Sequence, residues 1–213
     1  MIMIQLSPEL RKEFIQSTCQ YSEDSEELEL CLQSFYDRVV SSYLDSITVR
    51  DGTRRIQIEN EDGKQVPVSI RLNGRSKKVL APTCSTEIEL KLRRIRCDDG
   101  PYRFSSNIYL EFFIPYCRFT TIAVAEIVLN QSPTSRNREW MDQNRNTSSF
   151  HYKRCNRLCN KWHEWIGKTE RHNWNISREE DIFRICAECF SARKTTILCD
   201  RVKIRTVVWT FGE

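Results

Sequence analysis

Residues 88–114 read IELKLRRIRCDDGPYRFSSNIYLEFFI, and this stretch sets the class of fold that the sequence predicts. Ile88, Leu90 and Leu92 alternate with charged residues, which is the two-residue period of a strand with one buried face. The doubled Arg93-Arg94 breaks this alternation, as a β-bulge in this strand would.

Turn signals and apolar runs extend this pattern on both sides of the stretch. Residues 55–58 and 66–72 also alternate, with Pro67 indicating an edge position. The runs 108–114 and 119–129 are nearly continuous in apolar residues, which predicts central strands covered on both faces. Four pairs accept the positive φ angles of tight hairpins: Asp51-Gly52, Asp62-Gly63, Asn73-Gly74 and Asp99-Gly100. We therefore predict that residues 46–130 form an antiparallel sheet or small sandwich of roughly six to eight strands.

Helices are predicted before the sheet. Ser7-Pro8-Glu9 combines a capping residue, a first-turn proline and an acid that suits the positive end of the helix dipole. A second start lies at residues 22–25, and apolar residues recur every three or four positions through a helix at 25–47. The acidic run 23–29 complements the dipole of this helix, or alternatively forms a surface for a protein partner.

The predicted fold class is α+β, with N-terminal helices, a central antiparallel sheet or small sandwich, and a C-terminal zinc-stabilised module of helix and strand. Residues 1–48 form the helical segment that packs on the sheet, and residues 49–132 form the antiparallel β domain. Residues 133–150 are a polar linker, and residues 151–213 are a basic module rich in Cys, His and Trp. Within that module we expect a helix at 154–168 and a strand in 195–211 that returns to the sheet.

Charge is distributed unevenly along the 213 residues, although the net charge is only +4. Residues 1–50 hold 4 basic and 9 acidic residues, a net charge of −5, whereas residues 134–213 hold 16 and 10, a net charge of +6. A basic C-terminal third favours an anionic partner. With only six glycines, the chain offers few places to cradle a nucleotide phosphate on bare backbone.

Two cysteine pairs in the C-terminal third have the spacing of a zinc site. Cys186 and Cys189 form a CxxC knuckle, and Cys155 and Cys159 are four residues apart on one face of the predicted helix. His163 lies one turn further on and is the substitute ligand. Cys199 is a further candidate, although it lies in a strand pattern. The alternative is that these residues are packed thiols, as we expect for Cys19, Cys31, Cys84, Cys97 and Cys117.

Cations and flat rings are interleaved around the first cysteine pair. Cations bind phosphates and rings stack on unpaired bases, so the mixture predicts nucleic-acid binding, with RNA favoured over DNA. The alternative is a tryptophan core with solvated cations. The candidate binding residues are Lys153, Arg154, Arg157, Lys161, Trp162, Trp165, Lys168 and Arg171.

A second basic patch is predicted on a strand of the sheet. It consists of Lys91, Arg93, Arg94 and Arg96, and Lys77-Lys78 would extend it into an electrostatic track. A solvated sheet face is the alternative interpretation.

Signals for an enzyme or a membrane protein are weak in this sequence. It holds no GxSxG, HExxH, P-loop or Rossmann motif, and no small-molecule substrate is evident. The N-terminal apolar run is too short for a signal peptide, and no 18-residue apolar run occurs, so we expect an intracellular protein without a membrane partner. In a reducing compartment the ten cysteines are expected to be thiols or zinc ligands rather than disulfides.

In composition the small, cysteine-rich, arginine-rich, glycine-poor chain resembles accessory proteins of RNA viruses, some of which bind RNA and suppress host defences. This resemblance of composition carries over to no individual residue. The leading hypothesis is a non-enzymatic, zinc-stabilised protein that binds RNA through its C-terminal third. The alternatives are a protein-interaction adaptor with a purely structural zinc site, using the acidic helix or a sheet edge, and a zinc-dependent enzyme.

Overall fold

The computed structural model describes residues 2–47, 49–50, 53–59, 64–83, 86–113, 118–123 and 207–210. These residues form helices and a mixed β-sheet, so the fold is α+β. The predicted zinc module lies outside the described residues, except for a strand at 207–210.

The chain begins with a strand that the sequence did not predict, β1 (Ile2–Gln5), followed by the two predicted helices. Helix α1 (Pro8–Gln20) begins after Ser7, whose hydroxyl accepts a hydrogen bond from the Leu10 amide. Helix α2 (Ser25–Ser46) begins after Asp24, whose carboxylate accepts hydrogen bonds from two first-turn amides. Both helix starts are therefore confirmed.

The sheet contains seven strands in the order β2-β3-β4-β5-β6-β1-β7. The remaining strands are β2 (Val49–Arg50), β3 (Thr53–Glu59), β4 (Gln65–Leu80), β5 (Ile88–Asp99), β6 (Tyr102–Leu110) and β7 (Val207–Thr210). Strands β2 to β6 pair antiparallel, as predicted for residues 46–130, but the sheet as a whole is mixed, because β1 pairs in parallel with both β6 and β7. Four apolar residues before a helix carry no signal for such a long-range pairing.

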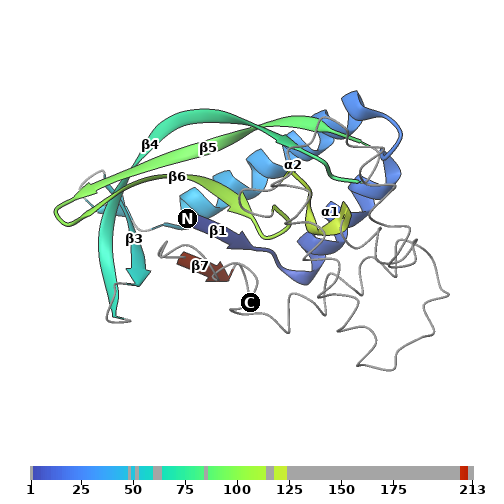
Figure 1. The fold of residues 1–213 in the computed structure, drawn as a ribbon. Helices are drawn as coiled ribbons and strands as arrows, with labels where there is room; N and C mark the ends of the chain where they lie inside the picture. The colour runs from blue at the N-terminus through green and yellow to red at the C-terminus, as the bar shows by residue number, and fades with distance from the viewer. Residues whose placement is uncertain are drawn as a thin grey trace, which may run out of the picture.

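Antiparallel hairpins join β2 to β3, β3 to β4, and β5 to β6. In the last of these, Asp99 lies opposite Tyr102, and Gly100 takes a φ of +49° in the two-residue turn between them. The long strands β4, β5 and β6 run side by side and bend together, and the β5–β6 hairpin projects away from α1 (Figure 1).

The hairpin turn predicted at Asn73-Gly74 is wrong, because these residues form a β-bulge within β4. The pairing with β5 shifts between Leu72 and Arg75, so that Asn73 and Gly74 lie opposite the single Arg94. Gly74 has a φ of +72°, a backbone conformation that glycine adopts more readily than other residues. An Asn-Gly pair accepts positive φ in a bulge as readily as in a turn, so local sequence does not separate the two.

The ribbon of β4 and β5 changes its buried face at this bulge. Alternate residues of a strand point to opposite faces. Ile88, Leu90 and Leu92 are buried on one face of β5, whereas Ile95 and Cys97 are buried on the other. The broken alternation in the sequence therefore marks a change of buried face, and the extra residue of the bulge belongs to β4 rather than β5.

The two apolar runs at 108–114 and 119–129 are buried where they are described, apart from the half-buried Tyr109, but neither is a continuous strand. Strand β6 ends at Leu110, and residues 111–112 form a turn. Phe119 and Thr120 form isolated bridges, and residues 121–123 are helical. Continuous apolarity reports burial rather than strand geometry, which is why the prediction failed.

The helices and strands share one hydrophobic core, which extends from Ile2 to Ala123. Phe14 of α1 stacks on Phe112 with a ring-centroid distance of 4.4 Å and contacts Phe35 of α2 edge-on at 5.3 Å. The predicted apolar stripe of α2 supplies Leu28, Leu32, Phe35, Tyr36, Val39, Val40, Tyr43 and Leu44 to this core. The domain boundaries proposed from the sequence stay predictions.

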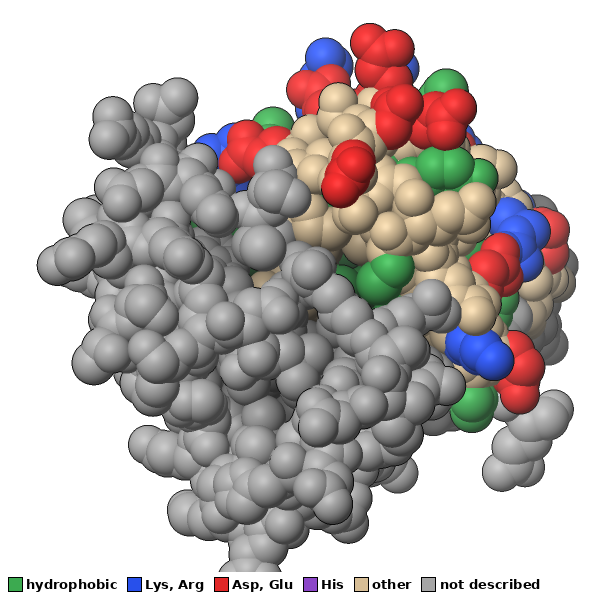
Figure 2. Space-filling model, turned by 90° about the vertical axis from the view of Figure 1, so that its right-hand side faces the viewer, with side chains coloured by type: hydrophobic (Ala, Val, Ile, Leu, Met, Phe, Trp, Pro, Cys, Tyr) green, Lys and Arg blue, Asp and Glu red, His purple; other side chains and the backbone are tan. Residues whose placement is uncertain are grey.

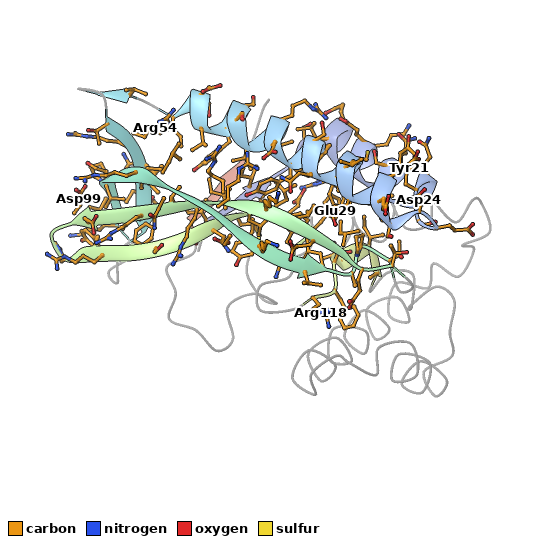
Figure 3. The ribbon with its side chains drawn as sticks, turned by 90° about the horizontal axis from the view of Figure 1, so that it is seen from above. Tyr21, Asp24, Glu29, Arg54, Asp99 and Arg118 are labelled. Carbon is orange, nitrogen blue, oxygen red and sulfur yellow. The ribbon has the colours of Figure 1, made fainter. Side chains whose placement is uncertain are left out.

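Side chains of α2 also hydrogen-bond the backbone of β5. Glu29 accepts a hydrogen bond from the Glu89 amide at 2.9 Å. Gln33 accepts one from the Lys91 amide at 2.8 Å and donates one to the Lys91 carbonyl at 3.4 Å. Glu29 lies on the side of α2 that faces the strands (Figure 3). Polar residues at the margin of the buried stripe thus satisfy strand groups that would otherwise lack partners.

The third contact of this kind is made by Tyr36 where β5 and β6 separate. Pairing between these strands ends at Arg94 and Asn107. At the next position the buried Tyr36 hydroxyl accepts a hydrogen bond from the Arg93 amide and donates one to the Ile108 carbonyl, both at 2.8 Å. Helix α2 therefore takes the place of β6 along this part of β5 and covers its free edge.

Candidate nucleic-acid interface

The residues that the sequence predicts for zinc and RNA lie outside the described residues, so their arrangement stays a prediction. These are the zinc ligands Cys155, Cys159, Cys186 and Cys189, the substitute His163, and the RNA-binding residues Lys153, Arg154, Arg157, Lys161, Trp162, Trp165, Lys168 and Arg171. Within the described ranges, no group of three or more Cys, His, Asp or Glu residues is arranged to hold a metal ion.

Three of the cysteines expected to be ordinary thiols are described. Cys97 is buried and its thiol contacts the Tyr102 carbonyl, whereas Cys19 and Cys31 are half-buried. Each of the three is a thiol rather than half of a disulfide.

The second basic patch predicted from the sequence falls on described strands, and the structure enlarges it. We define the arginine face as Arg55 of β3, Arg71 of β4, Arg94 and Arg96 of β5, and Arg103 of β6, all of which are exposed. Strand register places them on one face of the sheet, because residues that lie opposite each other share a face and the face alternates along each strand. The opposite face of the same strands contacts the core through residues such as Ile56, Ile70 and Ile95.

Four further cations lie beyond the bulge, on the other face of the β4–β5 ribbon. We define the ribbon cations as Arg75 and Lys77 of β4 with Lys91 and Arg93 of β5. Arg93 is half-buried and the others are exposed. Because the core contacts opposite faces of the ribbon before and after the bulge, both groups of cations lie on its solvent side.

Cations lie directly opposite cations at three positions of the β4–β5 register. The pairs are Arg71 with Arg96, Arg75 with Arg93, and Lys77 with Lys91. Like charges in directly opposed positions destabilise a sheet by roughly 0.2–1 kcal/mol each relative to neutral pairs. Two of the pairs, Arg75–Arg93 and Lys77–Lys91, are neighbours on one face of the ribbon, and Arg71–Arg96 lies on the other face.

Carboxylates neutralise some of this charge. Arg75 pairs with Asp37 of α2, Lys77 with Glu89, and Arg96 with Asp98, each at 2.8 Å. The hydrogen bond from Lys77 to Glu89 raises the pKa of that lysine. Among the described residues no carboxylate forms an ion pair with six of the nine cations, which are Arg55, Arg71, Lys91, Arg93, Arg94 and Arg103.

Two acids mark the boundary of the arginine face at the hairpin end. Asp98 lies on the face itself, opposite Arg103. The backbone amide of Ser69 hydrogen-bonds Asp99 and lowers the pKa of that carboxyl, with smaller contributions from Arg55 and Arg71. Asp99 lies at the tip of the hairpin (Figure 3).

The opposite end of the molecule is acidic. Figure 2 shows Asp and Glu side chains gathered over the end that carries the helices, away from the β5–β6 hairpin. Exposed acids near the start of α2 include Glu23, Asp24, Glu26 and Glu27. The described part of the molecule therefore has an acidic helical end and a basic strand surface.

The sequence identified part of this surface and missed the rest. Lys77, Lys91, Arg93, Arg94 and Arg96 were in the predicted patch, and all lie on the solvent side of the ribbon. Lys78 does not join them, because it is half-buried on the opposite face and its ammonium lies 5.6 Å from the centre of the Tyr109 ring.

The missed residues are Arg55, Arg71, Arg75 and Arg103. Their charges are visible in the sequence, but the register that brings them together is not. A turn at residues 73–74 would have separated Arg71 and Arg75 onto different strands.

Comparisons of the chain with protein-family models, curated proteins and solved structures found no match. No described helix is long and apolar enough to span a membrane.

Proposed function

We propose that the protein binds nucleic acid, with RNA as the preferred partner, and acts without enzymatic chemistry. The observation that carries the proposal is that three cation pairs lie in register on the solvent side of β4 and β5, and that one cation of each pair has no carboxylate partner among the described residues. Phosphates placed between opposed cations would relieve their repulsion. Bound nucleic acid would therefore remove an electrostatic repulsion that destabilises the unbound protein.

In this proposal the C-terminal third supplies a second contact. A structural zinc ion would fix the positions of the cations and rings around Trp162. Its ligands would be Cys155, Cys159, Cys186 and Cys189, with His163 as the substitute ligand. Cations there would bind phosphates and the rings would stack on unpaired bases. A role as a viral accessory protein that counters host defence is consistent with RNA binding and with the composition of the chain.

The proposal is tested by Arg71→Glu, which changes one cation pair into an ion pair. We expect this variant to be more stable than the parent by roughly 0.2–1 kcal/mol, because the introduced carboxylate would lie opposite Arg96. We also expect weaker RNA binding and a shallower dependence of affinity on salt. Urea unfolding measures the first effect, and fluorescence anisotropy with labelled RNA measures the second.

Lys12→Glu is the matched control, because it makes the same charge change at an exposed position of α1. It should leave RNA affinity close to that of the parent. Equal losses of affinity in the two variants would indicate a response to net charge alone and would count against a site on the strands.

The zinc component is tested separately by metal analysis of the purified protein and of Cys186→Ser. We expect about one zinc per chain, lost in the variant together with the folding of the C-terminal third. Arg157→Ala or Lys161→Ala should weaken RNA binding without unfolding. Unchanged folding and binding after complete chelation of metal ions would contradict the zinc proposal. RNA binding by the strand surface would still be tested by Arg71→Glu.

The second candidate function is a protein-interaction adaptor. Leu30 of α2 is 72% exposed beside Glu26 and Glu27, which would suit a partner with a basic and apolar surface. Binding of a protein partner that survives about 0.5 M salt and is lost in Leu30→Ser would favour the adaptor over polyanion binding.

A further inference from the structure

We infer that the arginine face binds the sugar–phosphate backbone of a double-stranded nucleic acid and reads no base sequence. This inference rests on the proposed function and assigns one form of nucleic acid to one face of the sheet. It depends on the chemistry of the face, on its width and on the kind of cation that it presents.

The chemistry of the face suits phosphates and not bases. A surface that holds single strands needs aromatic rings on which unpaired bases stack. The large exposed apolar side chains of the described residues are Leu30, Val49, Leu72 and Val79, and none of them is aromatic. Around the five arginines lie exposed Ser105 and half-buried Asn107, and serine and asparagine are residue types that also hydrogen-bond phosphates in nucleic-acid complexes.

The width of the face excludes entry into a major groove. Its arginines come from four adjacent strands, β3 to β6, and three inter-strand spacings of about 4.8 Å give a width of about 14 Å. The major groove of B-DNA is about 12 Å wide and admits a ribbon of two strands, whereas the major groove of duplex RNA is deep and narrow. A four-stranded face therefore lies across the backbone, where a duplex presents rows of phosphates from both strands.

The cations of this face are all arginines. A guanidinium binds phosphate oxygens through two parallel hydrogen bonds, which fixes orientation as well as charge. Only Arg96 among them has an ion-pair partner among the described residues, Asp98. Arg94 is held by a hydrogen bond from its Nε to the Ser105 hydroxyl at 2.9 Å, which orients the guanidinium and leaves its terminal nitrogens for a ligand.

The test compares duplex and single-stranded RNA with the full chain. The variant combines Arg71→Gln, Arg94→Gln and Arg96→Gln, and the probes are a 20-base-pair RNA duplex, a second duplex of unrelated sequence, and one separated strand. We expect both duplexes to bind the parent equally within about threefold. The variant should lose at least about tenfold in duplex affinity and about two to three units of salt slope, since each phosphate contact contributes somewhat less than one unit. Its affinity for the single strand should change by less than about threefold, because stacking residues elsewhere would hold that form.

The control variant combines Lys12→Gln, Arg38→Gln and Arg118→Gln, which removes the same charge from positions outside the arginine face and the ribbon cations. An equally large loss of duplex affinity in this control would overturn the assignment to the arginine face. Equal losses for duplex and single strand in the first variant would overturn the duplex inference while leaving RNA binding intact. Failure of the parent chain to bind any of the three probes would instead refute the proposed function itself.

Discussion

The hydroxyl of Tyr36 replaces a strand-to-strand hydrogen bond with two bonds of its own. Its partners, the Arg93 amide and the Ile108 carbonyl, belong to strands that diverge at this point. Removing the hydroxyl would deprive the buried Ile108 carbonyl and the half-buried Arg93 amide of this partner. The Tyr36 hydroxyl therefore supplies the hydrogen bonds that β5 and β6 lose where they separate.

We predict that Tyr36→Phe lowers the free energy of unfolding by about 1–3 kcal/mol, the usual cost of leaving buried polar groups unsatisfied. Urea unfolding measures this loss. Tyr21→Phe is the control, since it removes the same hydroxyl from a half-buried position at the end of α1. Similar losses in both variants would contradict a special role for Tyr36.

The same hydroxyl predicts a dependence of stability on alkaline pH. Burial raises the pKa of Tyr36 well above its ordinary value of 10.0, although the bond from the Arg93 amide opposes this shift. The unfolded chain loses the proton near pH 10 and the folded chain keeps it, so the folded state binds more protons and stability falls as pH rises above about 10. The decline should be shallower in Tyr36→Phe, as urea titrations between pH 8 and pH 11 would reveal.

Glu111 is a buried carboxylate that fastens the end of β6 to the start of α1. It forms two bonds with the Arg11 guanidinium, at 2.6 and 3.0 Å, and accepts a hydrogen bond from the Leu6 amide at 3.0 Å. Burial raises the pKa of Glu111, and Arg11 opposes the rise. Removing Arg11 would therefore leave the charged form of Glu111 buried without the guanidinium that stabilises it.

We predict that Arg11→Gln destabilises the protein by about 3–5 kcal/mol at pH 7, as expected when one partner of a buried ion pair is removed. In the variant the pKa of Glu111 rises further, so the folded state takes up a proton more readily than the unfolded state. Stability should then recover as pH falls from 7 towards 5. Denaturant unfolding at the two pH values tests this, and a loss that grows towards pH 5 would contradict the assignment.

At the scale of the element, α2 acts as both a core helix and an edge partner of β5. Its buried stripe was visible in the sequence as an apolar period. The polar residues at its margin resembled any solvated helix surface, because their strand partners are about 60 residues away. Local periodicity predicts which face a helix buries, but it does not predict which backbone groups its polar side chains satisfy.

We predict that Gln33→Ala accelerates hydrogen exchange at the Lys91 amide, because the variant removes the acceptor of that amide. The amides of Ile95 and Cys97, which lie where β5 pairs with β6, should keep their protection. NMR-detected exchange measures each site. Gln16→Ala on the exposed side of α1 is the control and should leave the Lys91 amide unchanged.

The bulge in β4 gives a second prediction at this scale. Gly74 has open space where a Cβ atom would lie, so the cost of Gly74→Ala is conformational and should be about 1–2 kcal/mol. Gly74→Asn should cost less, since asparagine tolerates positive φ. Equal losses of stability in the two variants would indicate that the bulge does not keep its left-handed residue in solution.

At the scale of the whole molecule, the sequence predicts features that neighbouring residues determine better than features that depend on pairing between distant segments. Helix caps, strand alternation and the β5–β6 turn were predicted because neighbouring residues determine them. The parallel strand β1 and the cation pairs were not, since each needs the position of a segment that lies between 14 (Lys77 to Lys91) and 106 (Ile2 to Ile108) residues away. The zinc and RNA-binding residues of the C-terminal third stay predictions from spacing and composition.

The sheet also joins the two ends of the chain, because β7 lies beside β1. We predict that removing residues 207–213 speeds hydrogen exchange in Ile2–Gln5 and promotes association between molecules, since β1 would become an exposed edge. Removing residues 211–213 alone is the control and should preserve β7. Unaltered exchange in β1 after the longer deletion would contradict this pairing.

The three side chains of α2 that hydrogen-bond β5 also limit how these two segments can change in length. From Glu29 to Tyr36 the helix rises about 10.5 Å, whereas from Glu89 to Arg93 the strand extends about 13 Å. Because the residue spacings of a helix and a strand differ, side chains of α2 can align with backbone groups of β5 over only a short distance. The different lengths of the Glu, Gln and Tyr side chains compensate for the difference of spacing. One inserted or deleted residue between Glu29 and Tyr36 would turn part of the helix by about 100° and carry side chains out of alignment with the strand. In natural variants of this chain, we expect substitutions on the outer side of α2 to be common and changes of length between these residues to be rare.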